Sequence, residues 1–180
     1  MSLAGAVGLA SPPMSDDTPA IDGAEFRNVL GHYPTGGTVV TAADDGPCGM
    51  VIGSFGSVSL DPPLVQFMPA KTSGTWARIE KSGKYCVNVL GADQLALCNS
   101  FFDKSKDPFD GFDWHPGVTG SPVIDGCLCH IDCEIHEAVD AGDHYIVIGR
   151  VVDLAPGTNT GGPLLFFKGG YGNFAELGGD

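Results

Sequence analysis

"GMVIGSFGSVSLDPP" occupies residues 49–63, and Asp61 is its one charged residue. The stretch reads as a buried strand, yet it carries three glycines and three serines where a core strand would carry Val, Ile or Leu. Glycine inside a strand marks a place where a ligand or another backbone approaches closely. The stretch therefore predicts that a flat, non-protein group lies against this part of the chain.

The segments around this stretch are predicted strands, joined mainly by short turns. Residues 44–46, "DDG", are a turn signal, and they make the opening stretch the return strand of a hairpin. The other expected strands are residues 38–43, 64–68, 85–90, 127–139, 144–154 and a closing segment at 163–172. This pattern predicts a mainly β fold, an antiparallel barrel with flanking helices.

Short helices are predicted over residues 22–30, 73–83 and 92–102. Asp22 and Ser73 are the expected N-caps, and Gly83 is the expected stop of the second helix. The first helix carries an apolar stripe made of Phe26, Val29 and Leu30. A long loop is predicted from Asp103 to Ser121, after the third helix.

Length and composition favour a single domain without a nucleic-acid partner. Residues 1–20 are rich in Ala, Gly, Ser and Pro and are predicted to be a mobile arm, so the domain spans 21–180. The net charge is −13 with nine Lys plus Arg, which argues against nucleic acid and anionic membranes. No secretory signal or run of 18 apolar residues is evident, so we expect a cytoplasmic protein without a membrane span.

Six cysteines raise the alternatives of zinc ligation and core packing. Cys127, Cys129 and Cys133 fall on one face of a predicted strand. Side chains two apart on a strand are roughly 6.6 Å apart, too far for both sulfurs to bind one zinc ion comfortably. We therefore predict packing residues and no metal, and we place His130 and His136 on the exposed face of the same strand.

Taken in order, the motifs of this chain resemble those of the flavin reductase-like family, whose fold is the FMN-binding split barrel. The matching segments cover about residues 24–174 and are "FRNVLGHYPTGGTVVT", "GMVIGSFGSVSLDPPLV", "KTSGTW", "GKYCVNVL", "FDGFDWHPG", "GSPVIDG", "GDHYIVIGRVVD" and "PLLFFKGGYG". Within the family, the likeness is greatest to the small reductase components of two-component monooxygenases. The resemblance implies hydride transfer from NADH or NADPH to FMN or FAD, release of the reduced flavin to a separate flavin-dependent monooxygenase, and a homodimer.

The resemblance also assigns site residues. His144 and Asp143 are the candidate catalytic pair, with His144 near the nicotinamide and Asp143 fixing its tautomer. Ser73, Thr75 and Lys71 would hold phosphate, and Tyr171 would cover the nicotinamide side. The full set expected to bind flavin or nicotinamide is Thr35, Gly36, Met50, Val51, Ile52, Gly53, Ser54, Phe55, Ser57, Val58, Ser59, Lys71, Ser73, Thr75 and Tyr171.

Structural roles remain open for several of these residues. Ser73 can act only as a helix cap, the serines at 57 and 59 can bond within the sheet, Lys71 can be a surface residue, and His144 can end a turn. Phe101, Phe102 and Phe109 read as core residues and are not in the predicted site.

The chain departs from the family motif "GMTxNSFTS" at Val51, Gly53 and Gly56. Losing two polar side chains at the flavin would weaken its binding by about 10- to 100-fold unless backbone donors compensate. Such weak binding suits a flavin that diffuses in and out as a substrate. It also leaves two alternatives: a non-catalytic flavin- or haem-binding protein on this fold, and an oxidoreductase that retains its flavin.

Overall fold

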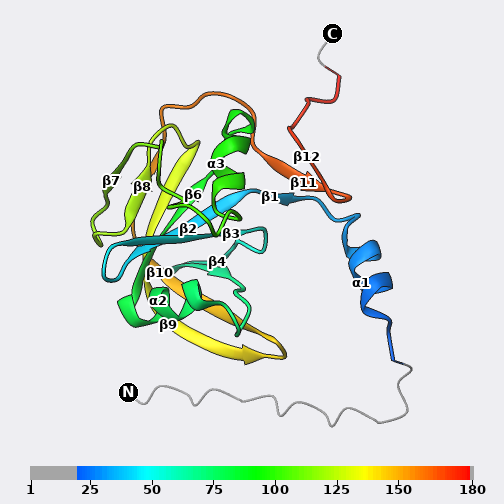
Figure 1. Cartoon of the computed structure of the whole chain (residues 1–180), viewed down its shortest axis with the longest axis horizontal. Helices are drawn as coiled ribbons and strands as arrows, with labels where there is room; N and C mark the ends of the chain where they lie inside the picture. The colour runs from blue at the N-terminus through cyan, green and yellow to red at the C-terminus, as the bar shows by residue number, and fades with distance from the viewer. Residues whose placement is uncertain (1–19, 179–180) are drawn as a thin grey trace.

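The computed structural model describes residues 20–178, so the predicted arm at 1–20 lies almost entirely outside the described residues. Figure 1 shows the elements in chain order. The first half contains α1 (Gly23–Leu30), β1 (Thr35–Gly36), β2 (Thr38–Ala43), β3 (Pro47–Ile52), β4 (Gly56–Leu60), β5 (Pro63–Phe67), α2 (Gly74–Ser82) and β6 (Lys84–Val89). The second half contains a 3-10 turn (Ala92–Gln94), α3 (Leu95–Ser100), β7 (Trp114–Pro116), β8 (Pro122–Ile124), β9 (Cys129–Ala141), β10 (His144–Pro156), β11 (Leu165–Phe167) and β12 (Gly170–Gly172).

Seven strands form the main sheet, in the order β3-β2-β6-β9-β10-β5-β4, and each neighbouring pair is antiparallel. Its two edge strands, β3 and β4, follow one another in the chain and are linked only by Gly53–Phe55. So short a link cannot span more than about 14 Å, because an extended chain rises at most ~3.6 Å per residue. The sheet therefore curls until its edges approach each other. The predicted antiparallel split barrel is confirmed, and Gly53–Phe55 lies at its split.

The prediction of one strand running through Met50 to Ser59 is wrong, because the strand breaks at Gly53–Phe55. The Ser54 hydroxyl oxygen accepts a hydrogen bond from the Met68 backbone N–H at 2.9 Å. The Ser54 carbonyl oxygen accepts another from the Gln66 side-chain amide at 3.2 Å. These bonds satisfy the backbone where the ladder stops, so the chain can change direction at the split.

All three glycines in this stretch lie close to protein atoms that a side chain would crowd. A Cβ at Gly49 would lie 2.7 Å from the Phe101 ring, and one at Gly56 would lie 3.3 Å from the Gln66 amide nitrogen. The expectation that all three glycines leave space for a flat group is therefore wrong at Gly49 and Gly56. Gly53 is different, because it lines two cavities.

The predicted caps are confirmed. The Asp22 carboxylate accepts hydrogen bonds from the backbone N–H groups of the first turn of α1. The Ser73 hydroxyl accepts one from Trp76 N–H at 3.2 Å, and Gly83 ends α2 with φ at 68°. Both ends of α2 are thus fixed by local sequence, and its Trp76 and Ile79 side chains are buried in the core.

The apolar stripe of α1 is not buried, although the helix forms as predicted. No residue of α1 is buried, and Phe26, Val29 and Leu30 are 53, 60 and 52 % exposed. Figure 1 shows α1 outside the barrel. No helix within residues 20–178 is long and apolar enough to cross a membrane.

The segment predicted as a loop from Asp103 to Ser121 contains one short strand, β7, which pairs with β8. The C-terminal end of this 103–121 segment is held by Asp132, which is fully buried. The Asp132 carboxylate accepts hydrogen bonds from the Thr119 hydroxyl at 2.6 Å and from Thr119 N–H at 2.8 Å. Because Asp132 lies on β9, this part of the loop is fixed to the barrel.

Candidate active site

The largest cavity at the split of the barrel, here called the main cavity, has a volume of about 680 Å³. Ligand sites usually have volumes between about 300 and 1,000 Å³, so a flavin or nicotinamide ring fits this space. Its walls come from α1, the end of β3, the segment after β5 and the β9–β10 turn. The lining residues are Phe26, Leu30, Met50, Val51, Ile52, Gly53, Ser54, Met68, Pro69, Ala70, Ala141, His144 and Ile146.

His144 and Ser54 are the two polar side chains in this otherwise apolar lining. His144 begins β10, and its Nδ1 lies 2.7 Å from Asp143 Oδ1. The hydrogen bond to His144 and the imidazole charge lower the pKa of Asp143, whose carboxylate is fully exposed. An ionised Asp143 accepts a hydrogen bond from His144 Nδ1–H, and His144 Nε2 is then available to bind a ligand group.

A second cavity, here called the side cavity, lies on the other side of the β3 end and has a volume of about 350 Å³. It shares Val51, Ile52 and Gly53 with the main cavity. Its complete lining is Thr35, Gly36, Gly37, Val51, Ile52, Gly53, Phe102, Phe166 and Tyr171. The two cavities therefore meet at the strand end that the opening stretch supplies.

At Gly53, the Thr35 hydroxyl takes up space that a side chain would need. A Cβ at Gly53 would lie 3.0 Å from Thr35 Oγ1, which is tighter than an ordinary contact. The polar side chain expected at position 53 from the family motif is thus absent, and a hydroxyl from β1 stands in the same region. Sequence spacing alone does not show this, because Thr35 lies on β1 of the small sheet, whereas Gly53 follows β3 of the main sheet.

The structure brings nine of the predicted cofactor-binding and catalytic residues to the two cavities. Met50, Ser54 and His144 line the main cavity, whereas Thr35, Gly36 and Tyr171 line the side cavity. Val51, Ile52 and Gly53 line both cavities. Asp143 does not line either cavity, but it is hydrogen-bonded to His144.

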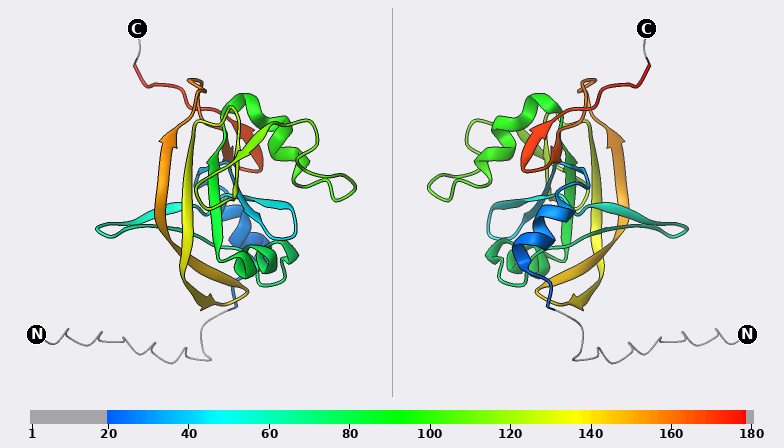
Figure 2. Two further views of the ribbon diagram at one scale, coloured as in Figure 1. Left: turned by 90° about the vertical axis from the view of Figure 1, so that its left-hand side faces the viewer. Right: turned by 90° about the vertical axis from the view of Figure 1, so that its right-hand side faces the viewer.

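Besides Asp143, four residues predicted to contact the flavin lie outside both cavities. Phe55 packs against the core. Ser57, Val58 and Ser59 lie on β4, at the edge of the main sheet. Figure 2 shows the β4–β5 hairpin extending from the side of the barrel. Because β4 turns away at Gly56, the residues after the break do not continue along the cavity as the single-strand prediction required.

The three predicted phosphate ligands are also outside the cavity linings. Ser73 caps α2, and Thr75 lies in the first turn of the same helix. The Lys71 ammonium donates to the Asp140 carboxylate at 2.6 Å. Lys71 N–H donates to the carbonyl of Asp143 at 3.0 Å, so this lysine is placed beside the His144 end of the main cavity.

Sequence reasoning missed the aromatic and aliphatic walls of the site. Phe26 and Leu30 were predicted only as part of an apolar stripe on α1, and here they line the main cavity. Phe102 and Phe166 line the side cavity, although Phe102 read as a core residue. The sequence carries no local signal for Phe102, because Phe101 and Phe102 follow one another at the end of α3 and only the contact of Phe101 with Gly49 distinguishes them.

Comparisons with known proteins give the family. The family model described as "Flavin reductase like domain" matches residues 30–175. The chain belongs to this flavin reductase-like family. A protein of Pseudomonas putida named "Flavin reductase" is 51% identical over 160 residues, which cover 88% of this chain and 94% of that protein.

Two further flavin reductase-like proteins support the same conclusion. The "Flavin-dependent monooxygenase, reductase subunit HsaB" of Rhodococcus jostii is 47% identical, over 84% of this chain and 78% of that protein. The crystal structure of nitrilotriacetate monooxygenase component B from Mycobacterium thermoresistibile is 42% identical and superposes with a TM-score of 0.82, covering 87% of this chain and 93% of that one. The resemblance read from the sequence is therefore confirmed.

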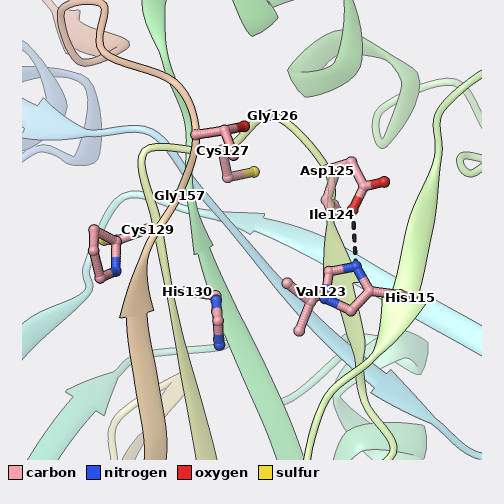
Figure 3. A pocket seen from close by; sticks show the side chains of 11 residues that line it. His115, Val123, Ile124, Asp125, Gly126, Cys127, Cys129, His130 and Gly157 are labelled. Carbon is pink, nitrogen blue, oxygen red and sulfur yellow. Dashed lines mark hydrogen bonds and ion pairs between the residues drawn. The ribbon is translucent and has the colours of Figure 1, made fainter.

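A third cavity, with a volume of about 290 Å³, lies between β8, the start of β9 and the end of β10, and contains two imidazoles. Figure 3 shows its His115–Asp125 pair, in which Nδ1 lies 2.8 Å from Oδ1. His130 is paired instead with Asp153 at 3.3 Å, and is partly buried rather than exposed as predicted. Within residues 20–178, no group of three His, Cys, Asp or Glu side chains is placed to hold a metal ion.

The cysteines near this cavity are core residues. Cys127 and Cys133 are 3 and 0 % exposed and belong to different core clusters, while Cys129 is partly buried. Cys127 precedes β9 rather than lying on it, so the predicted shared strand face is wrong at that residue. Burial is the main factor that raises the pKa of both Cys127 and Cys133 to about 12, which keeps these thiols protonated and poor zinc ligands.

We therefore expect metal analysis of the purified protein to find no stoichiometric zinc. A chelator should leave its Tm unchanged, because separated, protonated thiols do not form a tetrahedral site. Thermal unfolding with and without EDTA, together with elemental analysis, tests this. One zinc ion per chain would contradict the packing role of the cysteines.

Proposed function

We propose that this protein transfers a hydride from NADH to FMN or FAD and releases the reduced flavin to a separate monooxygenase. One observation carries the proposal: the main cavity joins a broad apolar surface to a single His144–Asp143 pair at one end. A flat ring needs the apolar surface, and a carboxamide or ring edge needs the polar end. Relatives named as flavin reductase and as the reductase subunit of a monooxygenase support the same activity.

The two ring systems supply the redox chemistry when bound, and the protein contributes binding and orientation. Hydride transfer needs the donor carbon and the acceptor nitrogen about 3–3.5 Å apart, with water excluded. The apolar side chains of Met50, Val51 and Ile146 exclude water from the rings. His144 Nε2 orients the nicotinamide carboxamide, and Asp143 is a positioning residue that holds the imidazole.

NADH is the proposed donor in preference to NADPH. No Lys or Arg is among the residues that line the main or side cavity in the described part of the chain. Asp143 and Asp140 add negative charge beside His144, and Lys71 is already paired with Asp140. The extra phosphate of NADPH would meet this acidic surface, where the Lys71 ammonium is already paired. Relatives named "FMN reductase (NADH)" and "NADH-dependent FAD reductase" agree with this choice.

A steady-state assay that crosses FMN and FAD with NADH and NADPH tests the proposal. We expect NADH oxidation only when flavin is added, and a protein that is colourless after purification. A yellow protein that needs no added flavin would favour an enzyme that retains its cofactor. The absence of a flavin-dependent rate with all four pairings would exclude the reductase activity.

We place the protein in the cytoplasm, where its product, reduced flavin, passes to a partner oxygenase. All six cysteines are free, which fits a reducing compartment. Weak retention of the flavin follows from the apolar residues at positions 51 and 53, where family members carry polar side chains. A flavin-dependent oxygenase added to the assay should therefore turn over without physical contact with the reductase.

The proposed assembly is a homodimer that covers α1. Phe26, Val29 and Leu30 are each more than half exposed, and an exposed apolar stripe of this kind is typical of a subunit interface. Val29 does not line either cavity, so it reports on the interface without touching the site.

We expect the protein to sediment at twice its chain mass of 18.6 kDa, and Val29→Glu to sediment as a monomer. The reason is that dimerisation would bury the new carboxylate without a partner. Analytical ultracentrifugation measures this, with Val118→Glu as an exposed control far from α1 in sequence. A monomeric wild-type protein would contradict the homodimer.

A further inference from the structure

The floor of the side cavity is a row of three side chains held in register by three strands. Thr35 of β1 lies opposite Phe166 of β11, and Phe166 lies opposite Tyr171 of β12. Residues directly opposite one another in antiparallel strands point to the same face of the sheet. All three line the side cavity, and the Phe166 and Tyr171 rings are 5.2 Å apart at 65°.

The Tyr171 ring is fixed by α3 as well as by its strand. Cys98 Sγ lies 3.5 Å from the Tyr171 hydroxyl oxygen. Burial, and then the neighbouring thiol, raises the pKa of Tyr171 to about 12, so the phenol is neutral at physiological pH. The Tyr171 hydroxyl is therefore engaged by Cys98 of α3, and the ring is the part of this side chain that a ligand can contact.

Phe102 is the third aromatic residue that lines the side cavity, and its neighbour Phe101 is anchored elsewhere. The Phe101 ring packs against Gly49, which has no side chain, and meets the Phe109 ring edge-on at 5.3 Å. Phe101 packs against the core cluster that contains Leu97 and Cys98 of α3, whereas Phe102 lines the side cavity and is 60 % exposed. An aromatic ring so exposed beside two others leaves a slot with apolar faces.

The chemistry of this slot differs from that of the main cavity. No charged side chain is among the described residues that line it, and the Thr35 hydroxyl is its one free polar side-chain group. Purine bases stack on aromatic side chains through their π-faces without needing particular hydrogen bonds. A nicotinamide would instead lose the polar contact that His144 offers in the main cavity.

We propose that the side cavity is a subsite for adenine, formed by Phe102, Phe166 and Tyr171. The inference rests on the proposed function, because adenine is the part shared by FAD and NADH. The two cavities share the β3 end, Val51–Gly53, so one dinucleotide reaches both by bending around that strand end. The flat group that the opening stretch predicts thus has neighbours on two sides of Gly53.

The test compares each dinucleotide with its mononucleotide in Phe102→Ala and Phe166→Ala. Removing one stacking ring should weaken binding of the adenine-containing ligand by about 10-fold relative to its mononucleotide. Fluorescence titration of FMN and FAD gives the Kd ratio without any turnover. If FAD supplies the adenine, the FAD/FMN ratio rises. If NADH supplies it, the Kd ratio of NADH to reduced nicotinamide mononucleotide, from fluorescence titration without flavin, rises instead.

Phe167→Ala is the matched control, since Phe167 is on the same strand, 46 % exposed, and does not line the side cavity. It should leave both ratios at their wild-type values. Phe102→Trp should restore or exceed wild-type binding of the dinucleotide. An equal loss of affinity for each dinucleotide and its mononucleotide, or no change in either ratio, would overturn the adenine subsite. Because the titration needs no turnover, a protein without reductase activity would still give a separate answer on adenine.

Discussion

His144→Ala should lower kcat/KM for NADH by about 2- to 13-fold while oxidised FMN still binds with nearly wild-type affinity. This range follows from losing one neutral hydrogen bond that contributes roughly 0.5–1.5 kcal/mol. His144 is the one imidazole in the main cavity lining, and its Nδ1 is engaged by Asp143. The loss should therefore fall on the nicotinamide, with the KM for NADH rising more than kcat falls.

Asp143→Asn separates positioning from chemistry, because this carboxylate contacts His144 and lies outside the cavity. It should give a smaller loss in the same direction. A larger loss in kcat, on the order of 100-fold, with a changed pH–rate profile would mean that His144 transfers a proton. His136→Ala is the control, since His136 is exposed on β9 and lines neither cavity. Wild-type kinetics in His144→Ala would contradict a role in nicotinamide binding.

Gly149→Ala should destabilise the fold by about 3 kcal/mol, a large part of the net stability of a domain of this size. A Cβ at this position would lie 1.8 Å from the Tyr85 hydroxyl oxygen. Tyr85 is fully buried and its ring packs against Phe67 at 5.0 Å, so it has little freedom to move. Gly149 also lies at a register shift between β10 and β9, where a strand glycine is expected.

Urea unfolding measures this change, with Gly172→Ala as the control. Gly172 is also in a strand, but no atom lies within 4 Å of a Cβ placed there, so its effect should be within about 0.5 kcal/mol. The double variant Gly149→Ala/Tyr85→Leu should lose less free energy of unfolding than the two single variants lose together, because the shorter side chain removes the clash. Additive losses, or a stable Gly149→Ala, would contradict the close approach.

Much of the fold followed from local sequence because its signals act over a few residues. Asp22 and Ser73 cap helices through hydrogen bonds to N–H groups two or three residues away. The turn at 140–143 joins two alternating segments, and β9 and β10 form a hairpin there as predicted. The site was recoverable in part for the same reason, since Met50–Gly53 and His144 lie in contiguous family motifs.

The residues whose positions differ from the sequence-based expectation are those whose surroundings come from distant parts of the chain. Ser57–Ser59 continue the sequence of the cavity strand, but hydrogen bonds of Ser54 to Met68 and Gln66 end that strand first. Phe102 looks like a core residue until Phe101 is seen to occupy the space beside Gly49. Neither contact is encoded in local spacing, because each joins residues more than ten positions apart.

The sequence by itself determined most of the helices and strands, the caps, the family and the strand end that lines the two candidate cavities. Short-range hydrogen bonding and side-chain alternation are sufficient for these, since both act within one element. Only the tertiary structure decided which glycine faces a cavity and which aromatic rings surround it. Curling of the seven-stranded sheet brings β3 and β4 together at Gly53, and register across β1, β11 and β12 aligns Thr35, Phe166 and Tyr171. These contacts join residues far apart in sequence, so they exist only once the barrel has formed.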